Sequence, residues 1–229
     1  MTYLRLALVG DYRPDAVAHQ AIPLAISLAA QALNLDVTPQ WLPTETLNDR
    51  SMLQDFDAIW LVPGSPYHSD DAAFMTITYA RENNVPFLGS CAGFQYAIVE
   101  YARNVMGWTD AGHAETASGG RLVIAPLSCS LVEKNGDILI KPDTLLARAY
   151  GKSEITEGYH CNFGVNPDFV VELSGYPLRL SAHDRDGDVR AMELPGHKFF
   201  AATLFQSERA ALRHELSPLL VELLRAASQ

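Results

Sequence analysis

The sequence predicts an α/β fold in which helices cover both faces of a mostly parallel central sheet. Two observations support this prediction. In the first half of the chain, short apolar runs alternate with helical stretches, as in proteins whose parallel strands are buried on both sides. In the second half, short strands are separated by Gly, Pro and Asp-Gly, which predicts a small antiparallel addition.

The first half begins with LRLALVG (4–10), a continuous apolar run ended by a turn, which is typical of a buried strand. The Ala- and Leu-rich stretch 17–33 has helical composition, and Pro23 inside it marks a kink or a late start. Further strands are predicted at VTPQWL (37–42), DAIWLVPGS (57–65) and VPFLGS (85–90), and helices at DDAAFMTITYARENN (70–84) and at 94–105.

In the second half, DRDGDV (184–189) has the composition of a hairpin turn. The C-terminal stretch ERAALRHELSPLLVELLRAA (208–227) is predicted to be one amphipathic helix. No repeat or linker interrupts the chain, so we expect one domain over residues 1–229. Strands are predicted at RLVIAPL (121–127), LRLSAHD (178–184), VRAMEL (189–194) and FFAATLF (199–205).

The composition narrows the classes of partner. A formal net charge of −10 argues against nucleic acid. The cysteines Cys91, Cys129 and Cys161 form neither a disulfide framework nor a metal-ligand spacing, so we expect no metal and no cofactor. The N-terminal apolar run is too short and too early for a signal peptide, and no run is long enough to span a bilayer. We therefore expect a cytoplasmic protein with reduced thiols and no membrane partner.

Cys91 lies on the sharp turn between a predicted buried strand and a helix, in the segment FLGSCAGFQ. Gly89 and Gly93 flank it, as the tight turn of a nucleophile elbow requires. The helix that follows directs free N–H groups and its dipole at the thiol, and the N–H of Ala92 can stabilise an oxyanion. The alternative is a small, inert cysteine buried in a tight turn.

The longer segment YARENNVPFLGSCAGFQYAIVEYARNVMG resembles the nucleophile segment of class I glutamine amidotransferases, and most closely that of the CTP synthase glutaminase domain. The family pattern Gly-x-Cys-x-Gly-x-Gln stands here as Gly89, Cys91, Gly93 and Gln95. Further segments resemble the family in order: ALVGDYRPDA, DAIWLVPGSPY, GGRLVIAPLSCSLV, YHCNFGVNPDFVVEL and VRAMELPGHKFFAATLFQSE. The resemblance implies a flavodoxin-like three-layer sandwich and a stand-alone glutaminase-like domain.

The resemblance also implies a Cys-His-Glu triad, in which the histidine moves the proton and the glutamate orients the histidine. Aligning AATLFQSER with the family's Ala-Thr-Gln-Phe-His-Pro-Glu places Gln206 at the histidine and Glu208 at the glutamate. A carboxamide does not titrate near neutral pH, so Gln206 can only exchange hydrogen bonds. The chain thus resembles the family with an incomplete triad.

Other site residues follow from the resemblance. Gly64 and Ser65 lie on the turn of the oxyanion strand, where Ser65 replaces a glycine, and the N–H groups of Ala92 and Ser65 are expected to face the oxyanion. Gln95 and Glu115 match substrate-contacting positions. The family's carboxylate-binding arginine is replaced by Asn162, which makes free glutamine a doubtful substrate.

Several groups are candidates to replace the missing base. His160 is the strongest, because YHCNF resembles a segment that lines the family's pocket, and His68 and His113 follow. His19, His183, His197 and His214 are expected at the surface or at element ends. Alternatively, Glu208 acts on a thiolate directly or through water, as in the DJ-1-like relatives of this fold.

These observations favour a Cys91-dependent hydrolase or transferase that acts on a small amino-acid-like amide or ester, descended from the CTP synthase glutaminase domain. The alternative is a catalytically inactive binding or regulatory protein that keeps the pocket. A homo-oligomer and a separate ammonia-accepting synthase subunit both remain open. A redox link between Cys91 and Cys161 requires that the two lie close together.

Overall fold

The computed structural model describes residues 2–117 and 119–229. Its main sheet has nine strands in the order β2-β1-β3-β4-β12-β11-β10-β7-β8. A separate sheet has three strands in the order β5-β6-β9. The bounds of the main-sheet strands are β1 Thr2–Val9, β2 Leu35–Leu42, β3 Ala58–Leu61, β4 Phe87–Ser90, β7 Lys134–Ile140, β8 Glu154–Tyr159, β10 Arg179–His183, β11 Val189–Glu193 and β12 Phe200–Thr203.

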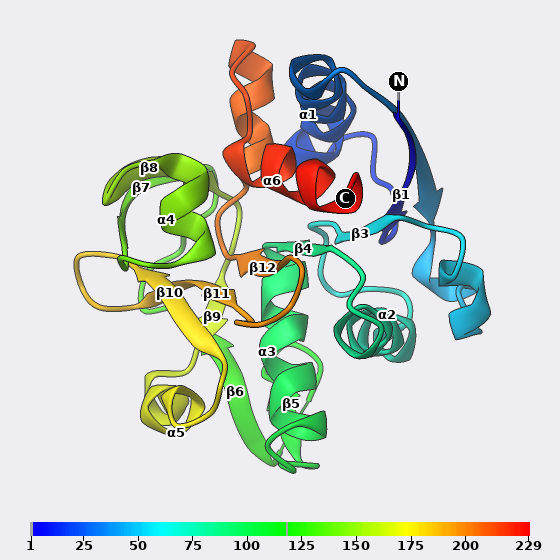
Figure 1. The fold of residues 1–229 in the computed structure, drawn as a ribbon. Helices are drawn as coiled ribbons and strands as arrows, with labels where there is room; N and C mark the ends of the chain where they lie inside the picture. The colour runs from blue at the N-terminus through cyan, green and yellow to red at the C-terminus, as the bar shows by residue number, and fades with distance from the viewer. Residues whose placement is uncertain (1, 118) are drawn as a thin grey trace.

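Strands β2, β1, β3, β4 and β12 run parallel to one another. In Figure 1, α1 (Val17–Leu33) and α6 (Pro218–Ala227) lie on one side of these strands, and α2 (Asp70–Glu82) and α3 (Ala92–Asn104) lie on the other. Both faces are therefore covered, and every residue of β3 and β4 is buried. This explains why these strands lack the apolar-polar alternation of a half-exposed strand. The predicted three-layer α/β fold is confirmed.

The antiparallel part continues the same sheet, because β11, β10, β7 and β8 each pair antiparallel with the preceding strand. The hairpin turn predicted between β10 and β11 is confirmed. There, Oδ1 of Asp184 accepts hydrogen bonds from the N–H groups of Asp186 (3.0 Å) and Asp188 (2.9 Å). Gly187 has a φ of +92°, which a residue with a side chain rarely adopts.

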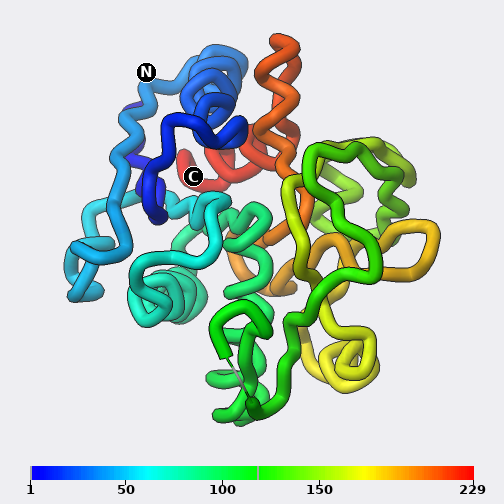
Figure 2. The backbone as a smooth tube through the Cα atoms, turned by 180° about the vertical axis from the view of Figure 1, so that it is seen from behind, coloured from blue at the N-terminus to red at the C-terminus, as the bar shows by residue number. Residues whose placement is uncertain are grey.

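The small sheet consists of β5 (Ala111–His113), β6 (Arg121–Pro126) and β9 (Phe163–Val165). β5 pairs parallel with β6, and β6 pairs antiparallel with β9. It lies at the opposite end of the molecule from α1 when viewed from the front and from behind (Figures 1 and 2).

The helices begin and end where local chemistry requires. Ser69 caps α2 by accepting a hydrogen bond from the N–H of Ala72 at 3.2 Å. Helix α1 begins at Val17 and contains Pro23 on its exposed side, so the helix does not start late. The remaining helices are α4 (Leu145–Tyr150), α5 (Val170–Ser174) and the 3₁₀ turns η1 (Thr44–Thr46), η2 (Arg50–Leu53) and η3 (Pro167–Phe169).

The prediction of a single C-terminal helix over 208–227 is wrong. The 3₁₀ turn η4 (Ser207–Arg213) ends at His214, whose φ is 59°. α6 then starts separately at Pro218, and Ser217 caps it. The proline explains the break, because it disfavours the helical conformation in the residue before it and has no N–H to donate.

Across the ranges that the structure describes, no helix combines the length and the apolar character needed to cross a bilayer.

Candidate active site

Cys91 occupies the junction between β4 and α3 in a conformation that side chains rarely adopt. Its φ is 53° and its ψ is −103°. Its N–H donates a 2.8 Å hydrogen bond to the carbonyl oxygen of Thr203 in β12, which holds the strained backbone in place. Such strain is concentrated at functional sites. The sharp strand-to-helix turn predicted here is confirmed.

The two glycines beside Cys91 are required by close backbone packing. A Cβ atom on Gly93 would lie 2.3 Å from the carbonyl oxygen of Leu61, and one on Gly89 would lie 2.8 Å from backbone atoms of Gly93. No side chain fits at either distance. The Gly-x-Cys-x-Gly pattern therefore allows α3 to start directly against β3, which brings the thiol to the carboxyl ends of the strands.

A cavity of about 310 Å³ opens at this edge of the sheet. It is bounded by the segment after β1, the turn after β3, the junction after β4 and the loop after β12, which is where ligands bind in open α/β sheets. Eight of the ten predicted site residues line it; Ala92 and Glu208 do not. The lining residues are Arg13, Asp15, Ala16, Val17, Ala18, His19, Pro63, Gly64, Ser65, Cys91, Gln95, Glu115, Glu133, His160, Cys161, Asn162, Phe163 and Gln206.

Backbone donors lie on two sides of the thiol. Ala92 is the first residue of α3, and N–H groups in the first turn of a helix have no intrahelical acceptor. The N–H groups of Phe94 and Gln95 return to the carbonyl oxygen of Cys91, at 3.1 and 3.2 Å. Across the cavity, the turn of Gly64 and Ser65 follows β3. This arrangement can place two N–H donors around a carbonyl oxygen.

Gln95 is fixed by its neighbours. Its Nε2 donates a 2.9 Å hydrogen bond to the carbonyl oxygen of Phe163, and its Oε1 lies 3.1 Å from Nε2 of His113. Nδ1 of His113 accepts a 3.0 Å hydrogen bond from the N–H of Glu115, so Nε2 carries the proton. Burial lowers the pKa of His113 to about 4. His113 is therefore a neutral support for Gln95.

Gln206 and Glu208 contain buried polar atoms without partners. Gln206 lines the cavity, but its Oε1 has no hydrogen-bond partner in residues 2–117 and 119–229, and the same holds for both carboxyl oxygens of Glu208. Burial raises the pKa of Glu208 to about 8, and the charge of Glu157 adds to the rise. Glu208 is therefore mostly protonated at neutral pH. Its side chain does not line the cavity.

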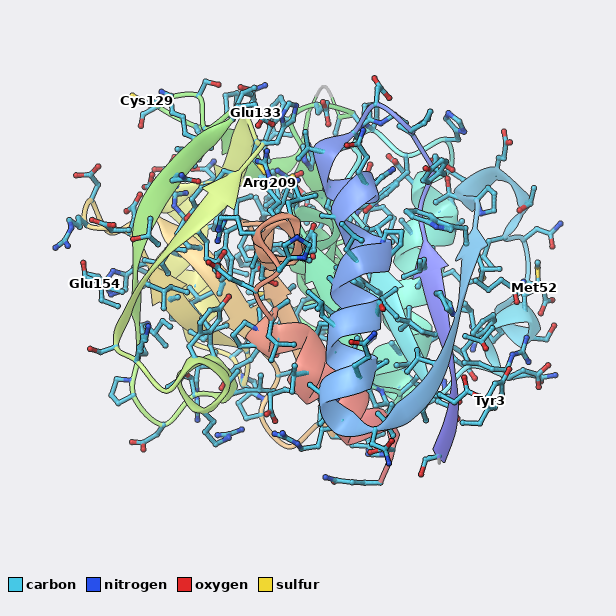
Figure 3. All side chains as sticks on the ribbon, turned by 90° about the horizontal axis from the view of Figure 1, so that it is seen from above. Tyr3, Met52, Cys129, Glu133, Glu154 and Arg209 are labelled. Carbon is cyan, nitrogen blue, oxygen red and sulfur yellow. The ribbon has the colours of Figure 1, made fainter. Side chains whose placement is uncertain are left out.

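His160 forms an ion-pair cluster at the mouth of the cavity. Its Nδ1 lies 2.8 Å from Oε1 of Glu133. Oε2 of the same glutamate pairs with the Arg209 guanidinium, and Figure 3 shows these two side chains near one another. The carbonyl oxygen of His160 lies 3.5 Å from Sγ of Cys91. The cluster therefore places a carboxylate-oriented imidazole on the residue whose backbone contacts the thiol.

Cys161 and Asn162 complete this wall. Cys161 is buried, and its Sγ donates a 3.4 Å hydrogen bond to the carbonyl oxygen of Leu204. The neighbouring Cys91 thiol, together with burial, raises the pKa of Cys161 well above the usual range for a thiol. It therefore stays protonated beside Cys91. A redox link requires that Cys91 and Cys161 lie close together. Both cysteines line the same cavity, so this requirement is met. Oδ1 of Asn162 accepts a 2.8 Å hydrogen bond from Ser130, and its carboxamide supplies no charge to the cavity.

His19 lies at an element end, as expected, because it is the third residue of α1, but it does not lie at the surface. It is fully buried in α1 and lines the cavity. The sequence carried a signal for this, because His19 is in helical phase with the buried Ile22 and Ile26. His68, in contrast, is exposed, lies 3.6 Å from Asp11, and is not part of the cavity lining.

Two further lining residues, Arg13 and Glu133, were not singled out in the sequence. Both lie in loops, where no periodicity marks them. In the ranges that the structure describes, no group of three or more His, Cys, Asp or Glu side chains is arranged to hold a metal ion.

Comparison with known proteins places these features in a family. The family model described as glutamine amidotransferase class-I matches residues 23–215. The chain is 32% identical over 241 residues to CTP synthase from Methanopyrus kandleri, covering 98% of this chain and 45% of the relative. It is 32% identical over 239 residues to CTP synthase from Sulfolobus acidocaldarius, with the same coverage of 98% and 45%. The chain thus spans about half the length of these relatives.

Solved structures share the fold. The glutaminase domain of Trypanosoma brucei CTPS with bound acivicin aligns with a TM-score of 0.86 and 24% identity, covering 98% of this chain and 93% of that one. A glutamine amidotransferase from Thermotoga maritima aligns with a TM-score of 0.62 and 12% identity, covering 99% of each chain. At these identities the similarity shows the fold alone.

Proposed function

Because the chain belongs to the class-I glutamine amidotransferase family, we propose that it is a Cys91-dependent hydrolase or transferase acting on a small amino-acid-like amide or ester. The position of Cys91 carries the proposal. Its strained backbone holds the thiol in the cavity wall, next to the first N–H of α3. An inert structural cysteine requires neither the strain nor the cavity.

In the proposed reaction, Sγ of Cys91 attacks the carbonyl carbon of the substrate, and the carbonyl oxygen becomes an oxyanion. The N–H groups of Ala92 and Ser65 stabilise this charge. The C–N or C–O bond then breaks, the leaving group takes up the proton lost by the thiol, and a thioester remains on Cys91. Attack by water or by a second nucleophile releases the acyl group and restores the thiol.

We assign the proton transfer to His160, since Gln206 cannot titrate. Nδ1–H of His160 donates to Glu133, which leaves Nε2 as the basic nitrogen. The glutamate orients the ring, as the acidic member of a triad does. Cys91 and His160 line the same cavity. Gln206 then serves as a neutral hydrogen-bonding group in the cavity wall.

The test is a panel of amino acid amides and esters incubated with the full chain, followed by intact-mass measurement of acyl adducts and assay of the released ammonia or alcohol. The expected result is an acyl adduct mapped to Cys91, with release of the leaving group, and the loss of both in Cys91→Ser. His160→Ala should slow turnover by at least about 100-fold, the lower end for loss of a general base. His68→Ala is the matched control, because His68 is an exposed histidine beside carboxylates outside the cavity.

Substrate turnover that survives in Cys91→Ser would contradict the proposal, as would a panel that yields neither adduct nor release.

A binding or regulatory protein is the second candidate, and the pair of Gln206 and Glu208 favours it. The position aligned with the triad histidine carries a carboxamide, and the aligned glutamate is buried with a pKa of about 8. The two candidates differ in what they require of Cys91. A binding protein should keep its ligand affinity in Cys91→Ser and should form no acyl adduct.

The partner of the reaction is also a proposal. Glutamine-like amides release ammonia, so we propose either a homo-oligomer that hydrolyses its substrate or a complex with a separate synthase subunit. Native mass spectrometry of the protein isolated from its source distinguishes the two by the masses of the chains that stay together.

A further inference from the structure

We propose that Arg13 binds a carboxylate of the substrate, on the side of the cavity formed by the β1–α1 segment and the turn after β3. The inference rests on the proposed function, because it takes Cys91 as the reacting group. The inference goes further than the proposed function in two ways. It says that the substrate is negatively charged, and it says where in the cavity the negative end binds.

The first observation is the position of the guanidinium. Arg13 lines the cavity, and a Cβ atom built on Gly64 would lie 3.4 Å from its Nη2. Gly64 has a φ of +134° and no side chain, so the guanidinium packs directly against the turn that leads to Ser65. Arg13 therefore presents its charge next to the proposed oxyanion donors.

The second observation is that the backbone of Arg13 is tied to the same turn. Its N–H donates a 2.9 Å hydrogen bond to Nδ1 of His19, and Nε2 of His19 lies 2.7 Å from the carbonyl oxygen of Pro63. Because Nδ1 accepts, Nε2 carries the proton and donates it to Pro63. The His19 ring packs against Tyr12 and Trp41, at ring distances of 5.7 and 5.0 Å. The segment is therefore ordered before any ligand binds, which reduces the entropic cost of using it.

The third observation is the charge of the cavity. Arg13 is the only Lys or Arg among its lining residues in the described ranges. In those ranges no carboxylate lies within ion-pairing distance of Arg13. Arg209, by contrast, is paired with Glu133. Asn162 carries no charge. Arg13, on a different wall, therefore supplies the positive charge of the cavity.

The chemistry favours a carboxylate over a phosphate. A guanidinium binds a carboxylate through two parallel hydrogen bonds. Asp15, Glu115 and Glu133 line the same cavity, and they would repel the second charge of a phosphate monoester. A single guanidinium suits a ligand with a single negative charge.

The test compares the alkylation of Cys91 by iodoacetate and iodoacetamide, two reagents of similar size that differ in charge. The Cys129→Ser background removes the exposed thiol. At about pH 9, above the usual thiol pKa of about 8.5, an accessible thiol reacts even without activation. The ratio of the two rates therefore reports on the charge beside Cys91, whether or not Cys91 is catalytic.

We expect Arg13→Met to lower the iodoacetate-to-iodoacetamide ratio by about tenfold, which corresponds to about 1.4 kcal/mol. Arg13→Lys should restore part of it, because lysine keeps the charge without the fork. Glu115→Gln should raise the ratio, since it removes a negative charge from the cavity lining. Arg50→Met, at an exposed arginine outside the cavity, should leave the ratio unchanged.

An unchanged ratio in Arg13→Met would overturn the inference, as would equal slowing of both reagents. Thermal unfolding of each variant checks that the fold is intact. If the proposed function is wrong, the result is different. The substrate panel then yields no acyl adduct, but Arg13→Met still lowers the ratio of the iodoacetate rate to the iodoacetamide rate.

Discussion

Nδ1 of His160 lies 2.8 Å from the Glu133 carboxylate, and the carbonyl oxygen of the same histidine accepts a hydrogen bond from the Cys91 thiol at 3.5 Å. His160 lies in the β8–β9 loop, and Glu133 is the residue before β7. Gln206 and Glu208, which the sequence resemblance aligns with the family's triad, follow β12 instead. The proposal that the base has moved within the cavity follows from this pair of contacts.

Removing the carboxylate of Glu133 should weaken catalysis without unfolding the protein. We expect Glu133→Gln to reduce turnover of any substrate found in the panel by about tenfold or more, because the ring loses the acceptor that orients it. Steady-state kinetics measure the effect. Glu154→Gln is the control, since Glu154 is an exposed glutamate that pairs with Arg185 outside the cavity lining, and Figure 3 shows it apart from Glu133. Equal effects of the two variants would argue against a role for Glu133.

Placing a histidine at position 206 should activate the thiol. Both carboxyl oxygens of Glu208 have no partner in the described part of the chain, so an imidazole at position 206 gains an acceptor and Cys91 gains a base. We expect Gln206→His to raise the alkylation rate of Cys91 by iodoacetamide at neutral pH. The gain should disappear in the double variant with Glu208→Gln. A rate that is unchanged, or a gain that survives in the double variant, contradicts this account.

The buried carboxyl of Glu208 should make stability depend on pH. Its folded-state pKa of about 8 exceeds the ordinary value of 4.5, so the folded state holds a proton that the unfolded state has released. The free energy of unfolding should therefore fall as pH rises from 4.5 to about 8. The slope is at most about 1.4 kcal/mol per pH unit for one group.

Urea unfolding at several pH values measures this slope. Glu208→Gln should reduce the slope by the contribution of this one carboxyl across the window. Burial raises the pKa of Glu157 to about 7, so this carboxyl also lowers the free energy of unfolding as pH rises, but only up to about pH 7. The variant Glu157→Gln measures this second contribution separately. An identical slope in the parent protein and Glu208→Gln would show that the carboxyl is not buried as described.

Gly93→Ala should destabilise the fold. A Cβ atom there would lie 2.3 Å from the carbonyl oxygen of Leu61, so α3 must move away from β3. Overpacking of this kind costs about 1–3 kcal/mol. Urea unfolding compares it with Gly119→Ala, where, beyond the chain neighbours, no atom of the described residues lies within 4 Å of the new Cβ and stability should not change. Equal stabilities of the two variants would contradict the close packing at the turn.

The sequence predicted the parallel half of the fold well, because its information is local. The apolar runs of β1, β3 and β4 and the Ser-Asp start of α2 each mark an element without reference to distant residues. The Gly-x-Cys-x-Gly segment was equally informative, and the resemblance drawn from it to class I glutamine amidotransferases is confirmed by the family match.

The antiparallel half was harder to predict. β7 has the sequence KNGDILI, in which Asn, Gly and Asp are poor strand formers, and it forms because it pairs along its length with β8. The single helix expected over 208–227 failed for a related reason. Its apolar residues had helical spacing, but Pro218 breaks the backbone regardless of the pattern.

The candidate site was predicted only where the residues follow a motif. Cys91, Gln95 and Gln206 belong to motifs, and all three line the cavity. Arg13 and Glu133 belong to no motif and reach the cavity only because the fold joins the β1–α1 and β6–β7 loops there. No spacing in the sequence encodes such a meeting.

The most direct test of the central claim is the rate at which iodoacetamide alkylates Cys91 as a function of pH, with Cys129 of the same chain as the exposed reference thiol. The account predicts that Cys91, although only 6% exposed, reacts faster than Cys129 near neutral pH, and that His160→Ala abolishes this advantage. A Cys91 that reacts more slowly than Cys129 at every pH would contradict the claim that this cysteine is a poised nucleophile.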